Sequence, residues 1–156
     1  MKTIEQIKKT WEAARLWQKD ILVAKALGCN PIVRSMPKVH CSLGQDFVSC
    51  SCKGLQHGYS DNKIDGYTVL YGYTIDPDAA LQAMKDVGME DESWGMHHCP
   101  AQDKPYERTE KYYISWYQNF KNVSTPSYTT FAEACAFVAY AFSELKQKEG
   151  TENDEG

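Results

Sequence analysis

The chain has 156 residues, of which 42% are hydrophobic and 24% charged, a size and balance typical of one soluble globular domain with a single core. It has no run of about 18 apolar residues, which excludes a membrane-spanning helix, and its polar first residues lack the apolar core of a secretion signal. The net charge is −4, but the last eight residues, 149–156, hold four of the 21 acids and none of the 17 bases, so residues 1–148 carry 17 of each. A neutral body offers little long-range attraction to duplex DNA. We therefore expect neither duplex DNA nor a membrane as a partner, and a cytoplasmic protein.

The acidic end of the chain differs in composition from the rest. Residues 149–156 have no apolar side chain to bury, and segments of this kind are typically disordered. We expect one folded domain over residues 1–148, followed by a disordered tail over residues 149–156. Cysteines in a cytoplasmic protein should be reduced. The six cysteines are Cys29, Cys41, Cys50, Cys52, Cys99 and Cys135.

Helical signals open the chain. Thr3 and Gln6 match a capping box, and apolar residues then recur at helical spacing as far as Gly28, a residue type that commonly ends helices. The sequence predicts one long helix or two successive helices over residues 4–27, with Asp20 as a candidate break.

Two further helices have clear starts. Asp76 followed by Pro77 is a typical N-cap and first-turn pair, and Gly88 ends the apolar pattern that follows. Thr130 and Glu133 form a second capping box, which begins a helix that we expect to run to about Lys148.

Strand signals fill the middle of the chain, where β-branched and aromatic residues alternate with polar ones. The expected elements are a hairpin over residues 38–52 with its turn at 44–46, a loop over 53–66, and strands over 67–75, 93–98 and 111–120. Together with the helices they predict an α/β (α+β) fold, an α-β-α sandwich in which helices cover a mostly antiparallel sheet.

Four segments, in order, resemble the phage ABA sandwich domain family of small phage-encoded proteins. They are the helix end at 22–28, the helix start at 76–84, the aromatic strand at 112–117 and the polar cap with Glu-Ala at 130–135. The resemblance covers residues 20–146. It implies an α-β-α sandwich and a phage or prophage origin, and it supplies no catalytic residues.

The chain departs from the pattern of that family in two places. Cys29 follows the helix-ending glycine where the family often has Trp, and the insert at 53–66 is longer than in the pattern.

One candidate chemistry is a zinc site, because three clusters of His and Cys offer suitable ligands. They are His40-Cys41, Cys50-x-Cys52 and His97-His98-Cys99. Their spacing matches no known zinc finger, and the alternative is that Cys41, Cys50 and Cys52 are buried in a hairpin, as free cysteines often are.

A second candidate is nucleophilic catalysis by Cys99. On a strand His98 would point to the opposite face, whereas His97 and Cys99 would share a face. No nucleophile elbow, oxyanion loop or third partner accompanies them, so we expect no catalytic residues. No phosphate-binding glycine motif is present either.

Aromatic residues on the predicted strands, with basic residues nearby, suit flat charged ligands such as nucleotides. The alternative is that these rings fill the space between the sheet and its helices. A sheet covered on one side only would expose some of them, and an exposed aromatic patch marks an interface. The candidate ligand-binding residues are Tyr71, Tyr73, Trp94, Arg108, Lys111, Tyr113 and Trp116.

The interpretation that we adopt is a phage-encoded, non-enzymatic binding protein in the cytoplasm of the bacterial host. We expect it to counteract host antiviral defence by sequestering a nucleotide-derived immune signal as a homo-oligomer, with no cofactor. Two alternatives stay open: an inhibitor or adaptor that binds a host protein, and a zinc-containing domain or enzyme.

Overall fold

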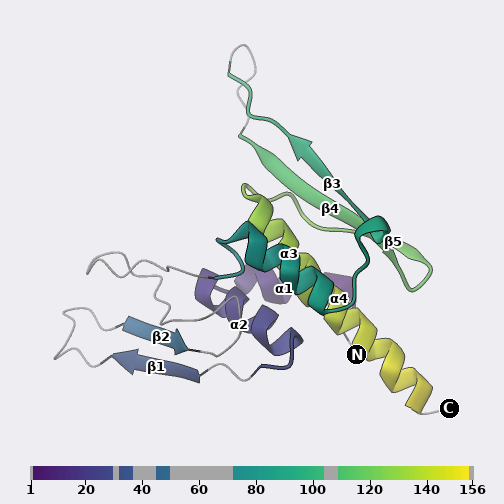
Figure 1. Ribbon diagram of the computed structural model, residues 1–156, viewed down its shortest axis with the longest axis horizontal. Coiled ribbons are helices and arrows are strands. Elements are labelled where there is room, and N and C mark those ends of the chain that lie inside the picture. The colour runs from purple at the N-terminus through teal and green to yellow at the C-terminus, as the bar shows by residue number, and fades with distance from the viewer. Residues whose placement is uncertain (1, 30–31, 37–44, 50–71, 104–108, 155–156) are drawn as a thin grey trace.

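The computed structural model describes residues 2–29, 32–36, 45–49, 72–103 and 109–154 (Figure 1). The elements in chain order are α1 (Ile4–Ala13), α2 (Leu16–Ala26), β1 (Ile32–Met36), β2 (Gln45–Ser49), α3 (Pro77–Asp86), the short 3₁₀ helix η1 (Asp91–Ser93), β3 (Trp94–Cys99), β4 (Lys111–Gln118), β5 (Lys121–Ser124) and α4 (Phe131–Asp154). The fold class is mixed α+β, with helices packed on an antiparallel sheet, as the sequence predicted. No helix in the described ranges is long and apolar enough to cross a membrane.

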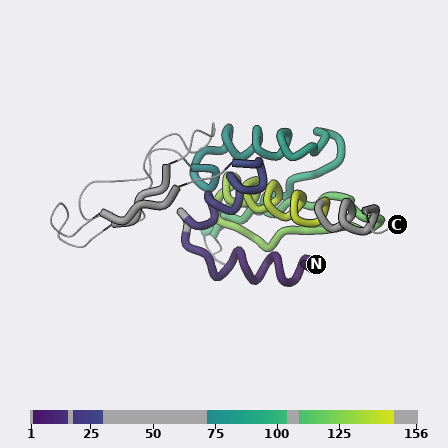
Figure 2. The backbone as a smooth tube through the Cα atoms, turned by 90° about the horizontal axis from the view of Figure 1, so that it is seen from below, coloured from purple at the N-terminus to yellow at the C-terminus, as the bar shows by residue number. Residues whose placement is uncertain are grey.

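Helix α4 is the centre of the molecule. It contacts α1, α2, α3 and β4, and Figure 2 shows it lying between α1 and α3. Every residue from Ala134 to Ala141 is buried, which is expected of a helix that is apolar all round. Trp11 of α1 anchors one side, with its ring stacked on Tyr140 at 5.8 Å and edge-on to Phe137 at 5.5 Å.

The predicted helix starts are confirmed in detail. In the capping box of α1, the Thr3 hydroxyl accepts from the Gln6 N–H at 3.3 Å, and Gln6 Oε1 accepts from the Thr3 N–H at 2.9 Å. Asp76 Oδ1 accepts from the N–H groups of Asp78 and Ala79 at the start of α3. These bonds satisfy backbone donors that have no partner within the helix.

Glycines end α2 and α3 for the same reason. Gly28 has φ +85° and Gly88 has φ +102°, the left-handed conformation that favours glycine after a helix. The N–H groups of Cys29 and Met89 then bond back to Ala24 and Met84 at 2.9 and 3.1 Å, as in a Schellman motif.

The break in the N-terminal helical segment lies at Ala14 and Arg15, not at Asp20. Asp20 lies within α2 and is fully buried. Its Oδ1 accepts from the Thr74 N–H at 2.9 Å. The carboxyl therefore holds the turn before α3 instead of capping a new helix.

Two expected strands are placed differently in the structure. The expected turn at 44–46 is wrong for Gln45 and Asp46, which belong to β2, and β2 pairs antiparallel with β1, a strand that begins at Ile32 and was not expected. β-branched Ile32 and Val33 favour a strand, whereas Asp46 does not, so pairing with β1 and not local preference places Gln45 and Asp46 in β2. The expected first strand at residues 39–43 and the loop at 53–66 lie outside the described residues.

The expected strand at 67–75 is described only from Gly72 onward, and there it is a turn. The N–H groups of Ile75 and Asp76 bond to the Gly72 carbonyl at 3.1 and 2.9 Å. Asp20 accounts for this difference. Its Oδ1 accepts a hydrogen bond from the Thr74 N–H, so this backbone donor bonds a side chain of α2 and not a neighbouring strand. A Cβ at Gly72 would lie 2.4 Å from Asp20 Oδ2, so the close approach requires glycine.

Helix α4 also extends beyond its expected end. It continues to Asp154, so residues 149–154 of the acidic segment that we expected to be disordered are helical. Glu149 continues a run of strong helix formers from Lys146 to Lys148, which favours continuation of the helix.

The cysteines are not all reduced. Cys29 is disulfide-bonded, whereas Cys99 and Cys135 are free thiols. Our expectation of six reduced cysteines is therefore wrong for Cys29. A disulfide needs two cysteines a few ångströms apart, and only the tertiary structure decides that proximity.

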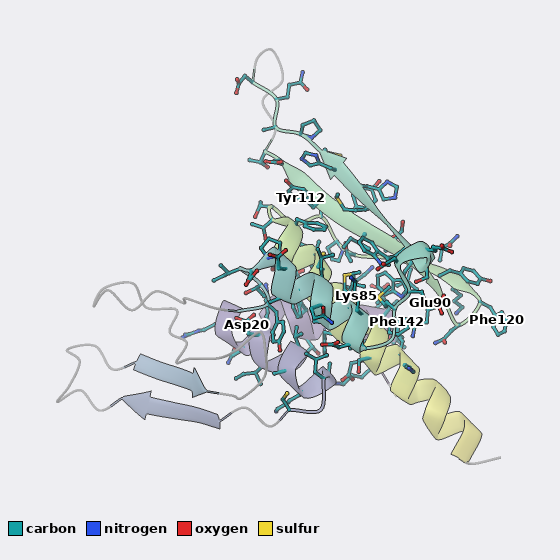
Figure 3. All side chains as sticks on the ribbon, viewed as in Figure 1. Asp20, Lys85, Glu90, Tyr112, Phe120 and Phe142 are labelled. Atoms are coloured by element: carbon teal, nitrogen blue, oxygen red, sulfur yellow. The ribbon has the colours of Figure 1, made fainter. Side chains whose placement is uncertain are left out.

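A two-residue turn, which the sequence did not suggest, folds β5 back onto β4. Gln118 pairs with Lys121, and Asn119 and Phe120 between them have φ of +54° and +62°, as in the type I′ turn that suits hairpins. Phe120 lies at the end of this hairpin (Figure 3) and is 92% exposed.

Replacing Phe120 by glycine should stabilise the protein. A non-glycine residue in this conformation costs about 1–2 kcal/mol, so we expect Phe120→Gly to raise the free energy of unfolding by about 1 kcal/mol, measured by urea denaturation. Phe120→Ala is the matched control, because it removes the ring and keeps the Cβ. Equal gains in both variants would contradict the role of backbone strain.

Asp20 should make stability depend on pH. Burial raises the pKa of its carboxyl from 3.8 to about 7, against the lowering effect of the hydrogen bonds from residues 73 and 74. Between these values the folded state keeps a proton that the unfolded chain has released, so the free energy of unfolding falls as pH rises. The contribution is complete below about pH 4 and lost above about pH 7, a change on the order of 4 kcal/mol.

Asp20→Asn cannot titrate and should flatten the pH dependence in this window. Urea denaturation at several pH values between about 4 and 8 measures the slope. Asp91→Asn, at an exposed position, is the control and should keep the slope of the parent protein. A parent slope that survives in Asp20→Asn would show that another group is responsible.

Candidate functional site

The three-stranded sheet has one buried face and one open face. Ile114, Trp116 and Gln118 of β4 are buried on the side of α4. The alternate residues of β4 point the other way, and their antiparallel partners in β3 and β5 share that side. We call this surface the outer face; it comprises Gly95, His97, Cys99, Lys111, Tyr113, Ser115, Tyr117, Asn122 and Ser124.

A shallow groove of about 460 Å³ lies at one end of the outer face. Gly95 and Ser115, which are paired across β3 and β4, lie at its floor. Tyr117, which is 59% exposed, and the polar side chains of Asn122 and Ser124 flank them. The groove therefore offers one flat surface, one aromatic ring and several groups that can donate or accept hydrogen bonds.

Gly95 is the most informative residue of this groove. It lies within strand β3, where glycine weakens a strand and often marks the close approach of a ligand or another backbone. A Cβ placed there would have no atom within 4 Å among the described residues. Packing therefore does not require glycine, and its absent side chain leaves the floor of the groove open.

His97 and Tyr113 form the adjoining part of the outer face. Their rings stack at 4.5 Å with only 7° between the planes, and His97 Nε2 lies 3.1 Å from the Ser115 hydroxyl. The stack restrains the imidazole, and the hydrogen bond connects it to the floor of the groove. This arrangement presents preorganised flat surfaces, which favour binding because fewer rotamers are lost.

A similar pair lies on the opposite face of the same two strands. His98 stacks on Tyr112 at 4.5 Å, and Glu110 Oε1 lies 2.6 Å from His98 Nε2 and accepts from the Tyr112 hydroxyl at 2.5 Å. The hydrogen bonds from Tyr112 and His98 lower the pKa of Glu110, and Glu110 in turn raises the pKa of Tyr112. None of these three residues lines the groove.

Four of the seven residues that the sequence proposed for ligand binding lie on the outer face or line its groove. Lys111 and Tyr113 lie on the outer face, as a binding role needs. Trp116 and its partner in β3, Trp94, line the groove. Trp116 is nevertheless 3% exposed and donates its indole N–H to Gln118 at 3.0 Å, and Trp94 packs against the core.

The other three candidates do not join the outer face in the described structure. Tyr73 is 2% exposed and lies in the turn held by Asp20, where it fills the core. Tyr71 and Arg108 lie outside the described residues.

Sequence reasoning missed Glu92, Gly95, Ser115, Tyr117 and Asn122. Gly95 carried a usable signal, because a glycine inside a predicted strand suggests an open approach. Ser115 and Asn122 carried none, because small polar residues are common on any solvent-facing strand.

The described residues contain no group of three His, Cys, Asp or Glu side chains placed to hold a metal ion. The sheet register puts His97 and Cys99 on the outer face and His98 on the other, so the cluster at 97–99 is divided between two faces. His40, Cys41, Cys50 and Cys52 lie outside the described residues, and zinc binding by them stays a prediction.

Comparison of the chain with protein-family models, with curated proteins and with solved structures gives no match. The resemblance to the phage ABA sandwich family stays a prediction from the sequence. The outer face and its groove therefore carry the functional argument.

Proposed function

We propose that the protein is a non-enzymatic binding protein whose ligand lays a flat ring on the outer face of the β3–β4–β5 sheet. The observation that carries the proposal is the open floor at Gly95, where no neighbouring atom requires glycine. Tyr117 and the stacked pair of His97 and Tyr113 provide aromatic surface on either side. Exposed aromatic residues on a sheet are a common platform for nucleobases.

A nucleotide-derived molecule is the ligand class that fits this surface best. Its base is flat and can stack, and Ser115 and Asn122 can bond the polar edge of a base. Lys111 lies exposed on the same face, where it can meet a phosphate. The surface also suits a binder more than a catalyst, because the hydrogen-bonded pair of His97 and Ser115 lies on an open face from which water is not excluded.

The biological setting that we propose follows from the resemblance of the sequence to phage-encoded domains. A small protein that holds a nucleotide-derived immune signal would counteract the antiviral defence of the bacterial host. Self-association into a homo-oligomer would add binding sites to each particle and is part of this proposal.

Gly95→Val tests the site without disturbing the fold. Valine favours strands, and the space above Gly95 is open, so stability should be kept or should rise by about 0.5–1 kcal/mol. The added side chain should fill the floor and weaken nucleotide binding at least about tenfold. Native mass spectrometry of the protein purified from cells, followed by titration calorimetry with a nucleotide panel, measures the bound ligand and its affinity.

Met96→Val is the matched control, because Met96 neighbours Gly95 on β3 and belongs to the opposite face. It should bind nucleotides as the parent protein does. Equal affinity of Gly95→Val and the parent protein would exclude the groove, and no binding to any nucleotide in the panel would overturn the proposed ligand class.

A host protein is the second candidate ligand, and Phe120 is the observation that favours it. This ring is 92% exposed at the tip of a hairpin, and Tyr117 is exposed on the adjoining strand β4. Apolar residues that cluster at an exposed tip suit a protein interface. Loss of a stoichiometric host partner in Phe120→Gly, with retention in Gly95→Val, would favour this function over nucleotide binding.

A further inference from the structure

The groove contains a single charged side chain. Of the residues that line it, only Glu92 has an acidic or basic side chain. Glu92 lies in η1, immediately before β3, where it is exposed and lines the groove. The remaining polar lining, such as Ser93, Ser115 and Asn122, is uncharged.

We propose that this carboxylate selects a base with two adjacent N–H donors, which among the common nucleobases is guanine. The proposal rests on the nucleotide-binding function proposed above and names the base that the groove takes. A carboxylate accepts hydrogen bonds through two oxygens and donates none. The ring N1–H and the exocyclic amino group of guanine form the matching pair of donors.

Adenine does not fit the same carboxylate. Its corresponding edge presents one amino donor beside a ring nitrogen that is an acceptor, so one oxygen of Glu92 would face a lone pair. A site built to bond N–H groups discriminates strongly against analogues that lack them, because its polar groups are left unpaired.

Charge also sets the direction of the ligand along the sheet. A phosphate beside Glu92 would be repelled, so the base, and not the phosphate, occupies the groove. Lys111 lies four residues from Ser115 along β4 on the same face, about 13 Å away at the rise of a strand. The phosphates of the ligand therefore extend over His97 and Tyr113 toward Lys111.

Titration calorimetry of the full chain with GDP, IDP and ADP tests the assignment. IDP keeps the N1–H and lacks the amino group, so it separates the two hydrogen bonds. A good bidentate contact discriminates by about 1–3 kcal/mol, so GDP should bind roughly ten- to a hundredfold more tightly than ADP, with IDP between them.

Glu92→Gln should lower the affinity for GDP at least about tenfold and should raise that for ADP, because the amide N–H can donate to the adenine ring nitrogen that the carboxylate repels. Glu90→Gln is the matched control, since Glu90 is exposed in the same acidic segment and does not line the groove. It should leave all three affinities unchanged, and a thermal denaturation curve verifies that each variant is folded.

The outcomes separate guanine selection from nucleotide binding. Equal affinities for GDP and ADP, or a Glu92→Gln variant that binds GDP as the parent does, would overturn guanine selection while nucleotide binding stands. Failure of all three nucleotides to bind the parent protein would overturn the proposed function and the base assignment together.

Discussion

The burial of α4 on all sides is the constraint from which the rest of the architecture follows. A helix that is apolar all round must be enclosed, and Ala134 to Ala141 have no solvent-facing side. Alanines let neighbouring helices approach closely, whereas Phe137 and Tyr140 fill the space toward Trp11. Three helices and one strand are needed to complete that enclosure.

This constraint also explains why the sheet has an open face. The sheet contributes one face to the enclosure of α4, with Ile114 and Trp116 as its buried contacts. The alternate residues of the same strand must then point outward. Because this strand is rich in aromatic residues, rings such as Tyr117 are exposed. Tyr117 lines the groove together with Gly95, which we propose as the ligand site.

Two polar contacts, one partly and one fully buried, hold α2 in place. Lys19 of α2 bonds Glu133 of α4 at 2.7 Å, and Asp20, the next residue, bonds the turn before α3. The second oxygen of Asp20 has no hydrogen-bond partner among the described residues, so the ionised form is costly to bury. Lys19 and Asp20 thus bond two different elements, α4 and the turn before α3, which fixes the position of α2. The same burial raises the pKa of the Asp20 carboxyl.

The sequence by itself determined the local elements that depend on neighbouring residues. The capping pairs at Thr3, Asp76 and Thr130, the glycine stops and the strand at 111–120 were all predicted, because caps and strand alternation act within a few residues. Of the outer face, the same reasoning found Lys111 and Tyr113.

Only the tertiary structure decided which face of each strand is covered and which distant segments meet. It placed Trp116 inside and Tyr117 outside, brought Asp20 to residue 74, and assembled Glu92, Gly95 and Asn122 around one groove. These contacts join residues far apart in the chain. No local pattern encodes them, because their partners are chosen by the packing of all the elements around α4 together.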